Sequence, residues 1–264
     1  MTGRTRWSKL SQASDGLLVV VLGIGSVLSR WPFQATLLDS YDAVNYALAL
    51  DHFDVRLGQP HAPGYPLYIL LGRAFNLIFQ DHLAALVWLS AVFSGLAVIA
   101  TYLAGREMFG RRVGVIAALL LATSTLFWYL GEAAAPYTID LFASALFGWL
   151  CYRLARSPGR AIVWISAVTL GLAGAFRLQT LVFLLPLFLY ALRNRSWKMV
   201  AGAVGTVGLV FGAFFGPAVM VSGGPSAFVR SMRATVPIFR STETLARSTR
   251  WTRFVKNAVT ITRG

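Results

Sequence analysis

Long apolar stretches alternate with short polar segments along most of the chain. A transmembrane helix needs about 20 predominantly apolar residues, and seven stretches reach or approach that length. They cover residues 16–33, 84–104, 113–131, 136–152, 161–176, 178–192 and 199–221. The first stretch follows a basic segment and lacks a small-residue cleavage site, so we interpret it as a retained signal anchor. The pattern predicts an all-α, polytopic membrane protein with about seven transmembrane helices.

An eighth apolar run, at residues 65–79, differs from the others. It is shorter than most of them, carries Arg73 and begins beside Pro63 and Pro66. We therefore predict an interfacial helix that lies along the membrane surface. A true span is the alternative, and it would place the basic cluster at residues 106–112 outside.

Basic residues form four clusters that decide the orientation. The clusters are Arg4/Arg6/Lys9, Arg106/Arg111/Arg112, Arg153/Arg156/Arg160 and Arg193/Arg195/Lys198. All four lie on one side of the membrane if residues 65–79 do not cross it and if Arg177 marks a turn between two short spans. The positive-inside rule then places these clusters and the N-terminus in the cytoplasm.

This topology divides the chain into three parts. Residues 1–221 form a transmembrane module, and within it residues 32–82 form the first extracytoplasmic loop with the interfacial helix. Residues 222–264 form a basic extracytoplasmic tail or the start of a truncated C-terminal region. The tail holds eight basic residues and one acid, Glu243, so we expect it to lie on anionic lipid headgroups. In the last span, Gly208, Gly212 and Gly216 predict close packing against another helix.

Composition supports the membrane assignment and excludes other classes. Hydrophobic residues make up 56% of the chain, charged residues only 13%, and the mean hydropathy is +0.63. An ordinary soluble domain carries about 25% charged residues, so a soluble enzyme is excluded. The single cysteine, Cys151, excludes a disulfide framework. The net charge of +14 is assigned to membrane topology rather than to a nucleic-acid partner.

Acidic residues gather in the predicted extracytoplasmic segments. Five of the ten acids lie in the first loop, namely Asp39, Asp42, Asp51, Asp54 and Asp81. Asp39, Asp42 and Tyr46 are spaced i, i+3, i+7 and share one face if the segment is helical. A carboxylate pair on one face can coordinate a cation, or one member can act as a base whose pKa the other raises. A solvated loop face is the alternative.

Three other ionisable side chains fall near the same predicted boundary. His61 lies in a turn rich in proline, where an imidazole can hydrogen-bond a phosphate or face water. Asp140 lies inside a predicted span, which favours a functional role, although it can also interact with the helix dipole. Arg177 can snorkel to the interface or bind the phosphate of a lipid-linked substrate.

Together these motifs resemble a known group of enzymes. The patterns are Asp-x-x-x-Tyr-Ala at residues 42–47, His-x-Pro-Gly-Tyr-Pro-Leu-Tyr at 61–68, Gly-Arg-Glu-Met-Phe-Gly-Arg-Arg at 105–112, and Gly-Glu followed by Pro-Tyr at 131–137. The chain resembles the polyprenyl-phosphate-sugar-dependent glycosyltransferases of the GT-C superfamily. Within it, the protein O-mannosyltransferase and aminoarabinose-transferase group (glycosyltransferase family 39-like) is the most similar.

The resemblance implies an active site at the outer face of the cytoplasmic membrane. Asp42 takes the position of the essential aspartate, with Asp39 as the near alternative, and would deprotonate an acceptor hydroxyl that attacks the sugar with inversion. The substrate-binding residues would be His61, Tyr46, Glu132, Tyr137, Asp140 and Arg177. The donor would be a polyprenyl-phosphate-linked sugar and the acceptor a protein, lipid or polysaccharide. The family pattern Asp-Glu is Asp42-Ala43 here, so a divalent cation is left open and no other cofactor is expected.

Two other classes compete with this interpretation. A lipid or solute transporter needs charged groups or broken helices along a path through the bilayer, whereas the span centres are almost free of charge. A non-catalytic, truncated membrane relative is the other alternative. The gathering of polar groups at one face favours chemistry at the membrane surface.

Overall fold

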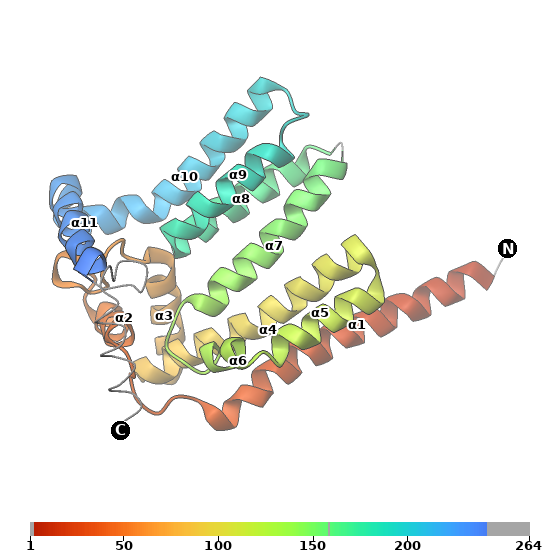
Figure 1. Ribbon diagram of the computed structural model, residues 1–264, viewed down its shortest axis with the longest axis horizontal. Coiled ribbons are helices and arrows are strands. Elements are labelled where there is room, and N and C mark those ends of the chain that lie inside the picture. Colours follow the sequence, from red (N-terminus) through yellow and green to blue (C-terminus); the bar gives the residue numbers. More distant parts are fainter. Residues whose placement is uncertain (1–2, 158, 242–264) are drawn as a thin grey trace, which may run out of the picture.

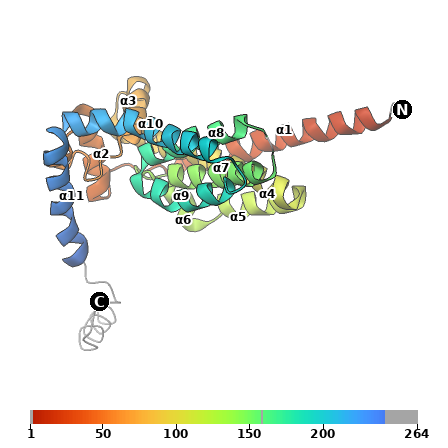
Figure 2. The ribbon, with the colours of Figure 1, turned by 90° about the horizontal axis from the view of Figure 1, so that it is seen from above.

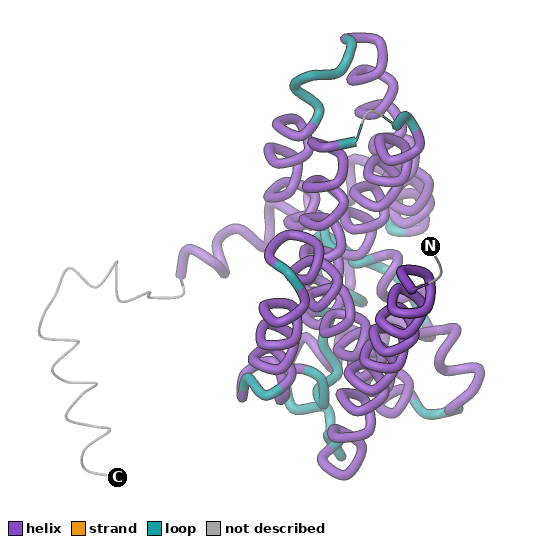
Figure 3. Tube along the Cα trace, turned by 90° about the vertical axis from the view of Figure 1, so that its right-hand side faces the viewer, coloured by secondary structure: helices purple, strands orange, loops and turns teal. Residues whose placement is uncertain are grey.

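The computed structural model describes residues 3–157 and 159–241. These residues form helices and connecting turns with no β-strand among them (Figure 3), which confirms the predicted all-α class. The α-helices are α1 (Gly3–Arg30), α2 (Tyr41–Asp51), α3 (Pro66–Phe79), α4 (His82–Phe109), α5 (Arg111–Ala122), α6 (Thr125–Leu130), α7 (Tyr137–Arg156), α8 (Ala161–Phe176), α9 (Leu178–Ala191), α10 (Trp197–Val221) and α11 (Gly224–Ser241). Two short 3-10 helices, η1 (Trp31–Phe33) and η2 (Val55–Leu57), lie in the connections around α2.

The long helices run side by side and form the body of the molecule (Figure 1). The turns between them fall at two ends. One end holds α2, α3 and α11 together with the 131–136 turn and the α8–α9 junction, while the other holds the α4–α5, α7–α8 and α9–α10 connections. The basic clusters therefore share one end of the bundle and the candidate site residues share the other. Which end faces the cytoplasm stays a prediction.

Within the part of the chain that the structure describes, three segments are long and apolar enough to cross a membrane, namely Asp15–Phe33, α4 and α10. Helices α3, α8 and α9 are apolar but shorter. A total of seven crossings stays a prediction, as does the interfacial position of α3. The predicted turn at Arg177 is present, because this residue has extended backbone between the end of α8 and the start of α9.

The stretch at residues 113–131 is not the single helix that the sequence predicts. Helix α5 ends at Ala122 and α6 begins at Thr125. Thr123 donates its hydroxyl to the carbonyl of Leu119 at 2.8 Å, and Ser124 has an extended backbone. Both residue types offer local hydrogen bonds that compete with a continuing helix.

Glycines allow close helix contacts, but not at the predicted positions. A Cβ atom built on Gly114 of α5 would lie 2.7 Å from the backbone nitrogen of Arg106 and 2.8 Å from the carbonyl oxygen of Tyr102, both on α4. In contrast, a Cβ at Gly208, Gly212 or Gly216 meets no described atom within 4 Å. The predicted packing stripe is therefore wrong within the described part of the chain, because α10 turns a different face, with Val207 and Val210, toward α8.

A buried carboxylate ties three helices together at the basic end. Asp15 on α1 lies 2.5 Å from Arg106 on α4 and 2.9 Å from Arg111 on α5, and it accepts a hydrogen bond from Tyr102 at 3.1 Å. A buried charge is tolerated only when it is paired in this way. The network sets how α1, α4 and α5 meet at the basic end.

We expect Gly114→Ala to lower the free energy of unfolding by about 1–3 kcal/mol, because the added methyl group overlaps backbone that cannot rotate away. Gly212→Ala is the matched control, and it should be neutral or slightly stabilising because alanine favours helix over glycine. Thermal unfolding of the two purified variants in detergent checks this. Equal unfolding temperatures would contradict the tight α4–α5 contact.

Candidate functional site

Helix α2 begins immediately before Asp42. The hydroxyl of Ser40 caps the helix by accepting a hydrogen bond from the backbone N–H of Ala43 at 3.1 Å. Asp42 occupies the first turn and its carboxylate is about half exposed. Asp39 lies before the cap, and its carboxylate accepts a hydrogen bond from Tyr129 of α6 at 2.7 Å. The expected common face for Asp39 and Asp42 is therefore wrong, because the helix starts between them.

The proline-rich turn brings His61 to Asp42. The Nδ1 atom of His61 lies 3.4 Å from Oδ1 of Asp42, and its Nε2 atom lies 3.1 Å from the hydroxyl of Tyr65. Tyr65 has a positive φ of 49° and Gly64 a φ of 108°. The left-handed backbone at these two residues turns the chain sharply into α3, which Pro66 opens.

Buried tyrosines support this contact from the core. The ring of Tyr46 lies 5.5 Å from the ring of His61, 5.2 Å from that of Tyr65 and 5.1 Å from that of Tyr68. Tyr46 is only 2% exposed, so it lies behind His61 rather than in an open site. Burial raises the pKa of the Tyr46 phenol, which therefore stays neutral.

The electrostatic environment favours a neutral His61. Burial lowers the pKa of the His61 imidazole, Asp42 raises it, and the positive charge of Arg177 lowers it again. The net direction is downward. A neutral imidazole that accepts a hydrogen bond from Tyr65 at Nε2 carries its proton on Nδ1, where it faces Asp42.

Arg177 is held in a fixed orientation beside this group. Its guanidinium donates to Oδ2 of Asp140, and Thr180 donates to Oδ1 of the same carboxylate at 2.7 Å. The guanidinium also lies over the ring of Tyr137, 5.3 Å from its centroid. Tyr137, Asp140 and Arg177 thus contact one another, with Asp140 as the counter-ion of Arg177. Thr180 was not identified from the sequence, because its role depends on the turn that brings it to Asp140.

Glu132 belongs to a different cluster. It is 8% exposed, its nearest charge is the fully buried Arg30, and burial raises the pKa of its carboxyl while Arg30 opposes that shift. Its backbone carbonyl accepts a hydrogen bond from Ala35 at 3.1 Å. Glu132, which the resemblance places among the substrate-binding residues, therefore lies beside Arg30 and does not line the polar cavity with Asp42 and His61. No sequence pattern indicated this role for Arg30, which lies within the apolar stretch at residues 16–33.

A cavity of about 510 Å³, here called the polar cavity, opens beside Asp42 and His61. It is enclosed by α2, the segment that contains η2, and α11. Its lining residues are Tyr41, Asp42, Val55, Arg56, Gly58, His61, Ala62, Arg230, Ser231 and Ala234. The presence of α11 in this wall was not expected from the sequence, which placed residues 222–264 outside the catalytic module.

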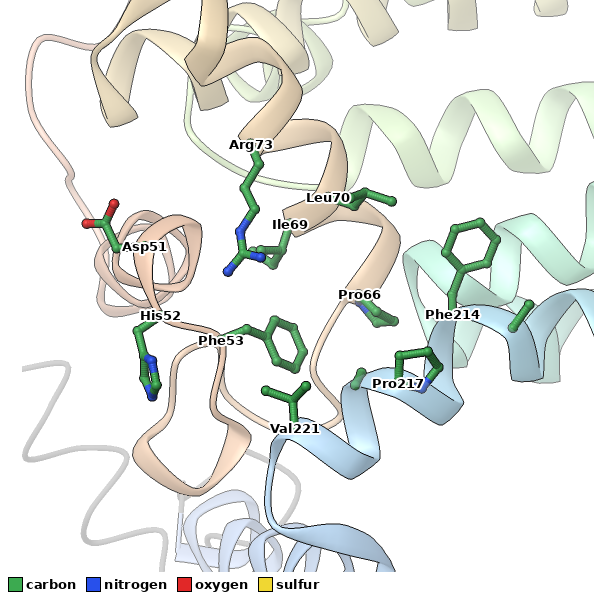
Figure 4. A pocket seen from close by; sticks show the side chains of 12 residues that line it. Asp51, His52, Phe53, Pro66, Ile69, Leu70, Arg73, Phe214, Pro217 and Val221 are labelled. Atoms are coloured by element: carbon green, nitrogen blue, oxygen red, sulfur yellow. The ribbon is translucent and has the colours of Figure 1, made fainter.

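A second cavity of about 510 Å³, here called the apolar cavity, lies at the same end of the bundle between α3 and α10 (Figure 4). Phe53, Pro66, Phe214, Pro217 and Val221 contribute to its mainly apolar walls. Arg73 also lines it and donates hydrogen bonds to the carbonyls of Leu50 at 2.8 Å and Ala49 at 3.0 Å. The cavity thus combines an apolar surface with a polar edge, where Arg73 is held at the end of α2 and Asp51 and His52 also contribute to the lining.

Metal ligands do not converge at this site. Within residues 3–157 and 159–241, no group of three or more His, Cys, Asp or Glu side chains is placed to hold a metal ion. The carboxylates predicted as a pair, Asp39 and Asp42, face separate partners.

These features define a helical membrane protein with a carboxylate–imidazole site at one end of its bundle. A family model described as the protein O-mannosyl-transferase TMEM260 N-terminal domain matches residues 52–201. The match covers more than half of the chain, so the chain belongs to this family of O-mannosyltransferase-type glycosyltransferases, and the suspected resemblance is confirmed. No curated protein and no solved structure matches the chain. The match begins after Asp42 and ends before α11.

We expect His61 to titrate below the ordinary histidine pKa of about 6.5. Asp42→Asn should lower the pKa of His61 further because it removes a negative neighbour, whereas Arg177→Gln should raise it because it removes a positive one. Proton NMR titration of the three histidines checks both signs. Because the fold disfavours protonated His61, the contribution of this residue to the free energy of unfolding should be highest above about pH 6.5. It should decrease as the pH falls from about 6.5 to the pKa of His61 in the folded protein. A pKa for His61 above 6.5 would contradict this electrostatic description.

Proposed function

We propose that the protein transfers a sugar, mannose by its family, from a polyprenyl-phosphate carrier to an acceptor hydroxyl at the extracytoplasmic face of the cytoplasmic membrane. The observation that carries this proposal is the Asp42–His61 contact at the edge of the polar cavity. The end of the bundle opposite this site carries the basic clusters, which supports a cytoplasmic position for that end. The acceptor is a hydroxyl of a protein, lipid or polysaccharide.

Asp42 acts as the general base in this proposal. Its carboxylate takes the proton of the acceptor hydroxyl while the oxygen attacks the anomeric carbon of the sugar. The bond from that carbon to the phosphate oxygen breaks, its electron pair leaves with the carrier phosphate, and the configuration inverts. The Nδ1 atom of His61 lies 3.4 Å from Oδ1 of Asp42, so the imidazole supports the position of this carboxylate. General-base catalysis of this kind contributes about 10²–10⁴-fold to rate.

The leaving phosphate gains negative charge and needs a nearby cation. Arg177 contributes a positive potential that reaches His61 and Tyr65, and Asp140 with Thr180 keeps its guanidinium in place. Asp140 and Tyr137 therefore act on the substrate through Arg177.

The apolar cavity supports a lipid-linked donor. An isoprenoid chain is fully apolar and is stabilised by contact with walls such as Phe214 and Pro217. The apolar cavity and the Asp42 site lie at the same end of the bundle, and residues of the segment that joins α2 to α3 line both cavities. One donor can therefore place its chain in the apolar cavity and its sugar beside Asp42.

We expect Asp42→Asn to lower the rate of sugar transfer from a prenyl-phosphate mannose donor by at least about 10²-fold, because asparagine cannot accept the proton. Asp39→Asn is the matched control, and it should retain most activity because Asp39 faces Tyr129 instead. Transfer is measured with the purified protein reconstituted in lipid. Equal rates for Asp42→Asn and the unmodified protein would remove Asp42 from this role.

Ala213→Trp places a large ring in the apolar cavity, so we expect it to raise the KM for a long-chain donor about tenfold or more while affecting a short-chain donor less. Leu209→Trp is the control, because Leu209 is exposed on the same helix and does not line the cavity. Parallel assays with donors of two chain lengths separate the effects. An unchanged ratio of the two KM values would show that the chain lies elsewhere.

A further inference from the structure

Helix α11 is docked onto the loop that carries the site. The hydroxyl of Ser222, which is fully buried, accepts a hydrogen bond from the backbone N–H of Val55 in η2 at 3.2 Å. Gly223 and Gly224 have positive φ values of 85° and 84°, so the chain turns sharply between α10 and α11. Figure 2 shows that α11 then runs across the end of the bundle. Its position over the polar cavity is thus set by contacts at its start.

Arg56 forms part of this junction. Its guanidinium donates to both carboxylate oxygens of Asp54, at 3.0 Å from Nε and 2.6 Å from Nη2, and Asp54 is only 2% exposed. The Nη1 atom of Arg56 lies 2.9 Å from where a Cβ on Gly223 would be. Arg56 therefore packs directly against the turn into α11, and Asp54 balances its charge.

Arg230 is the other arginine in the cavity wall. It lies on the exposed side of α11, and among the described residues no carboxylate lies within ion-pair distance of it. Helix α11 contains no acidic residue. Arg56 in the lining of the polar cavity is paired with Asp54. The remaining charged groups of the lining are the carboxylate of Asp42 and the guanidinium of Arg230, and no acid among the described residues balances the charge of Arg230.

We propose that Arg230 binds the phosphate of the lipid-linked donor in the polar cavity, and that α11 is therefore part of the glycosyltransferase site. This inference rests on the proposed function. A sugar phosphodiester carries one negative charge and the released prenyl phosphate gains a second. A guanidinium donates paired hydrogen bonds to phosphate oxygens and remains charged at every relevant pH. The family match ends at residue 201, so it assigns no role to Arg230.

The test measures binding of farnesyl phosphate and of farnesol, which lacks the phosphate, to the full chain purified in detergent. We expect Arg230→Gln to weaken farnesyl phosphate binding about tenfold or more and to leave farnesol binding unchanged. Arg233→Gln is the matched control, because Arg233 is an exposed arginine of the same helix that does not line the cavity. Arg230→Lys should recover part of the loss, because it keeps the charge without the paired donors. Unchanged thermal unfolding of each variant shows that the fold is intact.

The outcomes separate the two proposals. If Arg230→Gln and Arg233→Gln bind farnesyl phosphate equally, the role of Arg230 is overturned, while the activity of the Asp42 and Asp39 variants still tests the transferase. If the unmodified protein binds farnesyl phosphate no better than farnesol, the phosphate-linked donor is wrong and the role of Arg230 is overturned with it.

Discussion

The contact between Asp42 and His61 is the constraint on which the rest of the site depends. It requires α2 to begin at Tyr41 and the following turn to return to that helix start. The packed rings of Tyr46, Tyr65 and Tyr68 keep the turn in this position. Because these rings are buried, a displacement of His61 would open the core. The fold therefore stabilises one relative orientation of carboxylate and imidazole.

Charge is distributed along the bundle in a way that follows from burial. At the basic end, Asp15 is buried but paired with two arginines. At the site end, Asp54 and Asp140 are each paired with an arginine as well. Asp42 differs, since its partner is an imidazole whose pKa is lowered, and its carboxylate borders an open cavity. Its half-exposed carboxylate can be reached from the cavity by an acceptor hydroxyl, as the proposed role of Asp42 requires.

Three layers of the chain combine at the site end. Helix α2 and the turn before α3 supply Asp42 and His61, the α8–α9 junction supplies Arg177, and α10 and α11 line the two cavities. Residues of the segment that joins α2 to α3 line both the polar and the apolar cavity. The proposed lipid-linked donor, with its charged sugar phosphate and apolar chain, would match these two surfaces.

The sequence by itself determined the helical class, the membrane character and the separation of the basic clusters from the candidate site residues. It also selected Asp42, His61 and Arg177 as candidates, and their roles stay predictions. These properties follow from local hydrophobic runs and from the spacing of charged residues. Only the tertiary structure decided that Asp39 and Glu132 face other partners, that Asp140 serves Arg177, and that α11 enters the site. Such pairings join residues that are far apart in the chain. They depend on the residue at which a helix begins and on the face that it turns toward the core. The local sequence pattern specifies neither.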